Sequence, residues 1–251
     1  MSGMRMRSAS TTHPGLIRTA NEDSILVREA EHVWLVADGM GGHANGQWAS
    51  QMVARAVGDA PVSRDFDAAT TALADALHAA NGVIWSAAQG RGASMGSTAV
   101  LLMIRDGRFA CLWAGDSRAY LLRDGQLHRV SRDHTQVQEM VDRGLLTPAE
   151  AANHPMGHVL SRAVGVQERL ALDAVADAVH PRDIFLLCSD GLSGVVSEAE
   201  MTERLASLSG PAALKRLEEL VLSRGAPDNV SMIAVACEEA TALVLGAGVP
   251  A

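Results

Sequence analysis

The chain has 251 residues, of which 48% are hydrophobic and 20% are charged. This composition provides ample material for a buried core and excludes an intrinsically disordered protein. Asp and Glu total 29 against 21 Lys and Arg, which gives a net charge of −8. That balance argues against a nucleic-acid-binding protein, because such a protein needs a basic face.

Three cysteines, Cys111, Cys188 and Cys237, each lie in an apolar run and are not spaced for a disulfide framework or a thiolate metal site. We interpret them as buried free thiols, which favours a reducing compartment. The first residues are basic but lack the apolar stretch of a secretory signal. No apolar run reaches the ~18 residues that a membrane span needs. We therefore expect a cytoplasmic protein with no membrane and no nucleic-acid partner.

Short strands and two helices are predicted in the first third of the chain. Residues 24–27 and 33–37 form β-like runs, and residues 47–57 carry apolar side chains at helical spacing. A second helical pattern repeats at three- and four-residue steps, which places its apolar side chains on one face. That face comprises Phe66, Ala69, Leu73, Leu77, Ala80, Ile84 and Ala87.

The middle of the chain is predicted to be a β-meander. Strands are expected over 97–104, 109–114, 119–122 and 127–130. Asp106-Gly107 separates the first pair of strands and Asp124-Gly125 separates the second pair. Asp-Gly between apolar runs favours a tight hairpin, because both central positions of the turn adopt positive φ.

Residues 131–163 are polar and irregular, with a short helix predicted near 136–143 and a helix start at Thr147. Regular elements are predicted again further along the chain. They are strands at 184–188 and 230–237 and helices near 198–208 and 211–222. Strands, then helices, then strands indicate an α+β fold with helices packed outside the sheets. No shift in composition marks a domain boundary.

Four aspartates, Asp38, Asp116, Asp190 and Asp228, each lie at the end of an apolar run. A carboxylate in such a place is costly to desolvate and needs a cation or hydrogen-bond donors. Several carboxylates at one place could hold two hard divalent ions about 3.5–4 Å apart, the spacing that activates water for attack on phosphorus. Gly39, directly after Asp38, lets a backbone carbonyl approach a metal. A single Asp-Gly more often only closes a turn, so these residues alone leave both interpretations open.

Eight short motifs occur in order along nearly the whole chain. They lie at residues 18–23, 36–43, 96–99, 114–118, 133–135, 161–165, 189–192 and 228–231. In this order and spacing they resemble the protein phosphatase 2C family of metal-dependent phosphatases, in particular its compact bacterial serine/threonine members. Each motif alone is weak, but eight in the family's order are highly specific.

The resemblance implies one catalytic domain over 1–251, built as a central antiparallel β-sandwich flanked by helix pairs on both sides. Residues 131–163 would form a variable flap beside the active site. The implied activity is hydrolysis of phosphoserine and phosphothreonine on proteins by a metal-activated water, reversing a bacterial Ser/Thr kinase. We expect a monomer whose partners are phosphorylated protein substrates and a cognate kinase.

The resemblance also implies a set of metal ligands. Asp38, the carbonyl of Gly39, Asp190 and Asp228 would hold two Mn²⁺ or Mg²⁺ ions, with Asp38 bridging them. Asp116, together with Asp190, would match a weaker site for a third ion. The four aspartates are thereby given unequal roles, which their burial alone does not distinguish.

Two further residues take catalytic roles by the same resemblance. Glu22 would act through metal-bound water, and Arg18 would hold the substrate phosphate, for which a planar guanidinium is suited. Many relatives carry a histidine as general acid directly after the Asp-Gly, but this chain has Met40 there. The acid is therefore unassigned. A metal-bound water or His43 could serve, although His43 more often would cap or pack the following helix.

Two alternatives to a protein phosphatase remain at this point. One is a pseudophosphatase that binds phosphoproteins without hydrolysing them. The intact set Asp38, Gly39, Asp190 and Asp228 weighs against it. The other is a hydrolase of a different phosphate ester, because the motifs specify the chemistry and not the leaving group.

Overall fold

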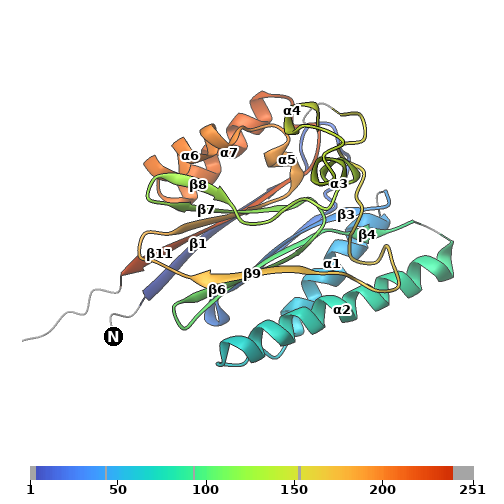
Figure 1. The fold of residues 1–251 in the computed structure, drawn as a ribbon, viewed down its shortest axis with the longest axis horizontal. Coiled ribbons are helices and arrows are strands. Elements are labelled where there is room, and N and C mark those ends of the chain that lie inside the picture. The colour runs from blue at the N-terminus through green and yellow to red at the C-terminus, as the bar shows by residue number, and fades with distance from the viewer. Residues whose placement is uncertain (1–3, 43, 93, 152–153, 240–251) are drawn as a thin grey trace, which may run out of the picture.

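The computed structural model of the protein describes residues 4–42, 44–92, 94–151 and 154–239. Two antiparallel sheets stack face to face, and helices cover the outer face of each sheet (Figure 1). One sheet has the strand order β1-β11-β10-β7-β8, and the other has the order β2-β3-β5-β6-β9 with β4 paired to β3. This arrangement confirms the predicted α+β sandwich with helices on both sides.

The strands follow the predicted order with two additions, β1 and β9, and the single strand predicted over 97–104 is divided into β4 and β5. The strands are β1 (Met4–His13), β2 (Asp23–Arg28), β3 (Val33–Met40), β4 (Gly96–Ser97), β5 (Ala99–Arg105), β6 (Arg108–Ala114), β7 (Arg118–Arg123), β8 (Gln126–Arg129), β9 (Asp173–Ala178), β10 (Ile184–Cys188) and β11 (Val230–Glu239). The helices are η1 (Glu29–Glu31), α1 (Ala44–Asp59), α2 (Phe66–Arg91), α3 (Gln136–Asp142), α4 (Pro148–Ala151), α5 (Asp190–Ser193), α6 (Glu198–Ser207) and α7 (Gly210–Ser223). None of these helices combines the length and the apolar character that crossing a bilayer requires.

Three hydrophobic layers hold the four structural layers together. The central layer lies between the sheets and includes Trp34 and Phe185, both almost fully buried. A second layer joins the sheet of β3 to α1 and α2 through residues such as Leu35 and Leu73. A third joins the other sheet to α5, α6 and α7. Trp34 and Leu35 are neighbours that face opposite layers, so β3 is apolar on both faces and appears in the sequence as a continuous apolar run.

Both predicted Asp-Gly hairpins are confirmed. The backbone φ values are 51° at Asp106 and 71° at Gly107, and 51° at Asp124 and 77° at Gly125. Positive φ at both central residues matches the right-handed twist of the flanking strands. The two turns join β5 to β6 and β7 to β8.

Two edge strands escape the sequence prediction. Residues 4–13 form β1, where Met4 and Met6 pack toward the central layer and the intervening arginine is exposed. This period-two alternation is a strand signal that the basic character of the segment hides. Residues 173–178 form β9, which is exposed over most of its length. Its alanines and aspartates have low β-propensity, so only the pairing with β6 makes it a strand.

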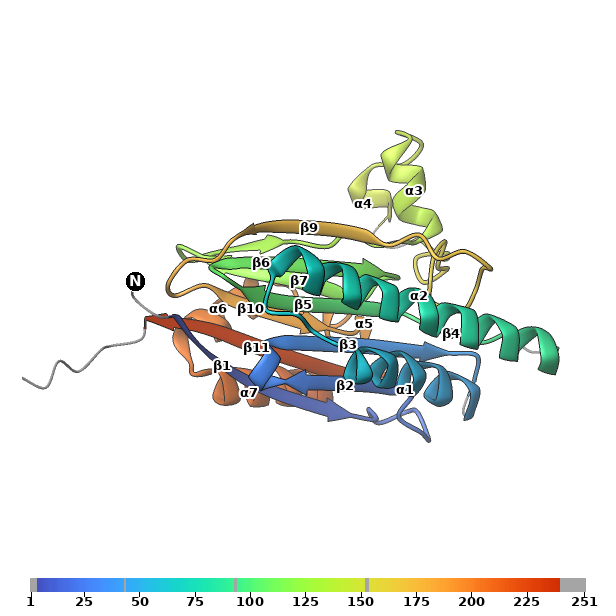
Figure 2. The same cartoon turned by 90° about the horizontal axis from the view of Figure 1, so that it is seen from below.

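The predicted flap lies outside the sandwich. Figure 2 shows α3 and α4 standing clear of the two sheets, in agreement with a segment that is polar in sequence. Thr135 and Leu160 pair through an isolated bridge that closes the base of the segment. Residues 152–153 of the predicted flap lie outside the described residues.

Candidate active site

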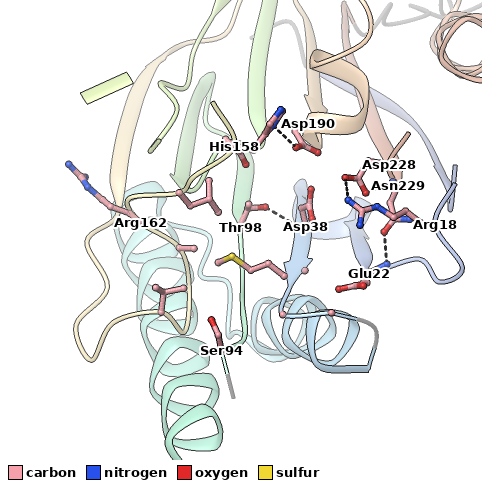
Figure 3. A pocket seen from close by; sticks show the side chains of 18 residues that line it. Arg18, Glu22, Asp38, Ser94, Thr98, His158, Arg162, Asp190, Asp228 and Asn229 are labelled. Carbon is pink, nitrogen blue, oxygen red and sulfur yellow. Dashed lines mark hydrogen bonds and ion pairs between the residues drawn. The ribbon is translucent and has the colours of Figure 1, made fainter. Parts of the chain in front are cut away.

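A cleft of about 410 Å³ gathers the predicted site residues. Figure 3 shows the side chains of Arg18, Glu22, Asp38, Asp190 and Asp228 around it, carried by several elements. Its lining includes Arg18, Glu22, Asp38, Gly39, Met40, Asp116, Asp190 and Asp228. The four aspartates are far apart in sequence, so the fold alone brings them to one place.

Asp38 is held from the strand side by Thr98. The Asp38 amide donates to Thr98 Oγ1 at 2.9 Å, and the Thr98 amide donates to the Asp38 carbonyl at 2.8 Å. Thr98 Oγ1 also lies 2.6 Å from Ser117 Oγ. Asp38 lies within β3, which continues to Met40, so the carboxylate projects from a paired strand and its backbone is fixed on both sides.

Two buried carboxylate oxygens near Asp38 have no hydrogen-bond partner, namely Oδ1 of Asp190 and Oδ1 of Asp23. The Cα atoms of Asp23 and Asp38 are cross-strand partners in β2 and β3. The other oxygen of Asp23 accepts a hydrogen bond from Ser189 Oγ at 2.8 Å. A buried carboxylate oxygen without a donor is costly, and a cation would relieve this cost.

The electrostatics of the acids agree with this interpretation. Burial, followed by the charges of neighbouring acids, raises the pKa of Asp38 well above its usual value. Burial and the nearby Asp190 raise the pKa of Asp116 to about 8. Burial likewise raises the pKa of Asp23 to about 7, although hydrogen bonds from two serines oppose the shift. Burial and Asp228 raise the pKa of Asp190. A divalent cation would offset the repulsion that causes these shifts.

Close backbone packing places Glu22 and Gly39 side by side. A Cβ on Gly39 would lie 2.1 Å from the Gly46 carbonyl oxygen and 2.6 Å from the Glu22 carbonyl oxygen. A Cβ on Gly46 would lie 1.9 Å from Glu22 Oε2. Position 39 therefore requires glycine, whereas a side chain at Gly46 would displace the Glu22 carboxylate. Gly46 belongs to the first turn of α1, and the partial positive charge of a helix N-terminus favours the Glu22 carboxylate there.

Arg18 enters the cleft from the loop between β1 and β2 (Figure 3). Its Nη2 donates to Asp228 Oδ2 at 2.7 Å, and this contact raises the pKa of Arg18 further. Asn229 fixes the loop: its Nδ2 donates to the carbonyls of Pro14 and Ala20 at 2.8 and 2.9 Å, and its Oδ1 accepts from the Glu22 amide at 2.8 Å. One side chain thus connects β11 to the loop that carries Arg18.

The flap side of the cleft adds two basic side chains. His158 Nδ1 lies 3.8 Å from Asp190 Oδ2, with a side chain that is 84% exposed. Arg162 also lines the cleft, and its Nη1 donates to Asp173 Oδ1 at 3.0 Å. The second oxygen of Asp173 lies 3.1 Å from Nε2 of His134, which is buried. Asp173 therefore joins the flap to the sheet at the start of β9.

The acids of the cleft fit a divalent metal by their chemistry, because carboxylate and carbonyl oxygens are the ligands that Mg²⁺ and Mn²⁺ prefer. No three His, Cys, Asp or Glu side chains within the described ranges are already arranged as a ligand cluster. One oxygen of Asp228 accepts a hydrogen bond from Arg18.

Several supporting residues are not singled out by sequence reasoning. Asp23, Thr98 and Asn229 lie inside the motifs at 18–23, 96–99 and 228–231, but no role is predicted for them. Gly46 lies outside all eight motifs. Each acts through a hydrogen bond or a close approach between distant segments, for which the sequence carries no local signal. His43, the candidate acid, lies outside the described residues, and Met40 lines the cleft.

Comparisons with known proteins agree with this site. A model of the protein phosphatase 2C family matches residues 18–222. The serine/threonine protein phosphatase PstP of Mycobacterium tuberculosis is 36% identical over 230 residues, which cover 91% of this chain and 44% of PstP. The chain thus spans less than half the length of that relative.

Two solved structures share the fold. PppA, a key regulatory component of the T6SS in Pseudomonas aeruginosa, matches with a TM-score of 0.87 and 41% identity over 94% of this chain and 100% of that one. The catalytic domain of PstP in complex with two manganese ions matches with a TM-score of 0.83 and 34% identity over 94% of this chain and 100% of that one. The family match and the shared fold together lead to one conclusion: this chain belongs to the protein phosphatase 2C family.

Proposed function

We propose that the protein is a metal-dependent serine/threonine protein phosphatase, which hydrolyses phosphoserine and phosphothreonine on other proteins. The observation that carries this proposal is the meeting of Asp38, Asp190 and Asp228 with Arg18 in one cleft. The relatives support it, since PstP is a serine/threonine protein phosphatase and its catalytic domain binds two manganese ions.

The metal ligands of this proposal are Asp38, the carbonyl of Gly39, Asp190 and Asp228. When bound, two divalent ions supply positive charge and lower the pKa of a water molecule, which makes it a nucleophile near neutral pH. The unpartnered Oδ1 of Asp190 and the raised pKa of Asp38 favour this assignment. Asp116, with its raised pKa, and Asp190 are assigned to a weaker third ion. Either Mn²⁺ or Mg²⁺ suits these oxygen ligands.

The protein's own side chains bind and orient the substrate. Arg18 has five N–H donors, so it can contact two phosphate oxygens while Nη2 stays near Asp228. Glu22, beside the first turn of α1, can accept a hydrogen bond from water and orient it toward phosphorus. Phosphoryl transfer depends chiefly on positioning and charge neutralisation, which these residues provide.

The wider setting is also proposed. Residues 131–163 are taken as a flap over the cleft within a single catalytic domain, because His158 and Arg162 reach the cleft from its C-terminal part and its border. A cognate Ser/Thr kinase would supply the phosphorylated substrates. The three buried free thiols fit a reducing, cytoplasmic setting. A monomer is expected, because the cleft is complete within one chain.

One experiment tests the function directly. The purified protein, loaded with Mn²⁺ or Mg²⁺, should hydrolyse both an aryl phosphate and a phosphothreonine peptide, and a chelator should remove both activities. A folded, metal-loaded protein that is inactive on both substrates would refute the proposal. Activity on the aryl phosphate alone would favour the alternative of a hydrolase of another phosphate ester.

A further inference from the structure

Two large aliphatic side chains are exposed directly beside the arginine assigned to phosphate. Leu16 is 60% exposed and Ile17 is 70% exposed, and Ile17 is the most exposed of the large apolar side chains in the described part of the chain. Single exposed apolar residues are common on protein surfaces. An adjacent pair directly before Arg18, which lines the candidate active site, is more specific, because apolar surface at such a place is available for contact with a substrate.

The turn that carries these residues is held by close packing and hydrogen bonds, so their exposure does not come from a loose loop. Gly15 has φ +78°, and a Cβ there would lie 2.3 Å from the Asp228 carbonyl oxygen. The Leu16 amide donates to the Ala226 carbonyl at 3.0 Å. Both ends of the loop are held by Asn229 through the carbonyls of Pro14 and Ala20. A surface ordered in this way loses little conformational entropy when it binds a partner.

The spacing suits a peptide whose phosphate contacts Arg18. Because one residue spans at most about 3.6 Å, the Cα atoms of Leu16 and Ile17 lie within about 7 Å of the Cα of Arg18. In an extended peptide, the residues one and two positions from the phosphorylated residue lie at the same range of distances. On the flap side, Val166 lines the cleft and is 41% exposed, which provides a second apolar contact.

We propose that Leu16 and Ile17 form a docking surface for an apolar side chain of the substrate, located one or two residues from the phosphorylated serine or threonine. The occupant is an extended segment of a phosphoprotein. The cleft itself binds the phosphate by charge and is the same for every substrate, whereas Leu16 and Ile17 select among substrates by the neighbouring side chain. This inference rests on the proposed phosphatase function.

The test compares two phosphothreonine peptides that are identical except for leucine or serine at the positions flanking the phosphothreonine. For the unmodified protein, we expect kcat/KM to be about tenfold higher for the leucine peptide, since partial burial of one aliphatic side chain supports an effect of this size. In the double variant Leu16→Ser/Ile17→Ser, the ratio of the two kcat/KM values should fall to about one. Thermal unfolding of the variant checks that it is folded.

Leu208→Ser is the matched control, because Leu208 is a 37% exposed leucine that does not line the cleft. It should leave the ratio unchanged. Two outcomes would overturn the inference while leaving the phosphatase function standing. One is equal kcat/KM values for the leucine and serine peptides in the unmodified protein. The other is an equal loss of kcat/KM on both peptides in the double variant. A change of oligomeric mass in the double variant with an unchanged ratio would assign the surface to self-association, which also overturns it. Inactivity of the unmodified protein on every phosphate ester would refute the proposed function itself.

Discussion

At the scale of single residues, the cleft concentrates acids that destabilise one another. Burial contributes most to the raised pKa of Asp38, and the neighbouring acids Asp23, Asp190, Asp116 and Asp228 add to it. Such a cluster stabilises nothing by itself, and a cation is the partner that makes it favourable. If these acids have unequal roles, variants of each acid should differ in how kcat depends on metal concentration.

Asp38→Asn should lower kcat by more than about 100-fold at any metal concentration, because the variant would lose the carboxylate proposed to hold both ions. Asp116→Asn should mainly raise the Mn²⁺ concentration needed for half-maximal activity. The measurement is kcat as a function of Mn²⁺ for each variant and the unmodified protein. If both variants lose activity equally at saturating Mn²⁺, the idea of a separable third site fails.

Arg18→Ala should raise KM for a phosphothreonine peptide by roughly 10–100-fold, the range expected for losing a charge-assisted hydrogen bond. The Mn²⁺ requirement should change less, even though Arg18 contacts Asp228. Arg55→Ala is a suitable control, since Arg55 is a 77% exposed arginine of α1 that does not line the cleft. An unchanged KM would remove Arg18 from the phosphate site.

At the scale of elements, local conformation determines what a glycine contributes. Gly125, in the turn between β7 and β8, has φ +77°, whereas Gly82 lies on the exposed side of α2 without a positive φ. A Cβ would meet nothing within 4 Å at either position. The same substitution should therefore act only through backbone conformation, with opposite signs at the two sites.

Gly125→Ala should lower the free energy of unfolding by about 1–2 kcal/mol, because a left-handed backbone is strained for alanine. Gly82→Ala should raise it by about 0.5–1 kcal/mol, since glycine is a poor helix former. Denaturant titration of both variants measures these values, and neither variant should change kcat/KM. If Gly125→Ala raised the free energy of unfolding as Gly82→Ala does, the turn geometry would be contradicted.

At the scale of the whole molecule, the acids couple stability to pH in the metal-free protein. The pKa of Asp23 is raised to about 7 and that of Asp116 to about 8, whereas an unfolded Asp titrates near 3.9. The folded state thus binds more protons than the unfolded state between these values. Stability from this source is fully present below about pH 4 and is lost as pH rises through about 7–8.

In the presence of a chelator, the melting temperature should therefore fall between pH 5 and pH 8. Mn²⁺ should raise it, and the increase should grow with pH, because the ligands must lose their protons to bind the ion. Asp116→Asn should show a smaller fall with pH, since the asparagine cannot titrate. A metal-free protein that becomes more stable between pH 5 and pH 8 would contradict the pKa values of these acids.

Local patterns in the sequence predict most of the elements correctly. The helical spacing from Phe66 onward predicts α2, and the Asp-Gly pairs predict both hairpins, because these signals depend on neighbours in the chain. The ordered motifs predict the family and the sandwich, and both are confirmed. The edge strand β9 is missed, because its residues do not favour a strand and only its partner β6 makes it one.

The sequence by itself determined that acids lie at the ends of apolar runs at Asp38, Asp116, Asp190 and Asp228, and that these acids need a cation or donors. Only the tertiary structure decided which groups stand beside them. The Arg18–Asp228 contact and the hydrogen bonds from Asn229 to the Arg18 loop join segments about 200 residues apart. Contacts of this kind are set by how the two sheets stack, and no local pattern in the chain encodes them.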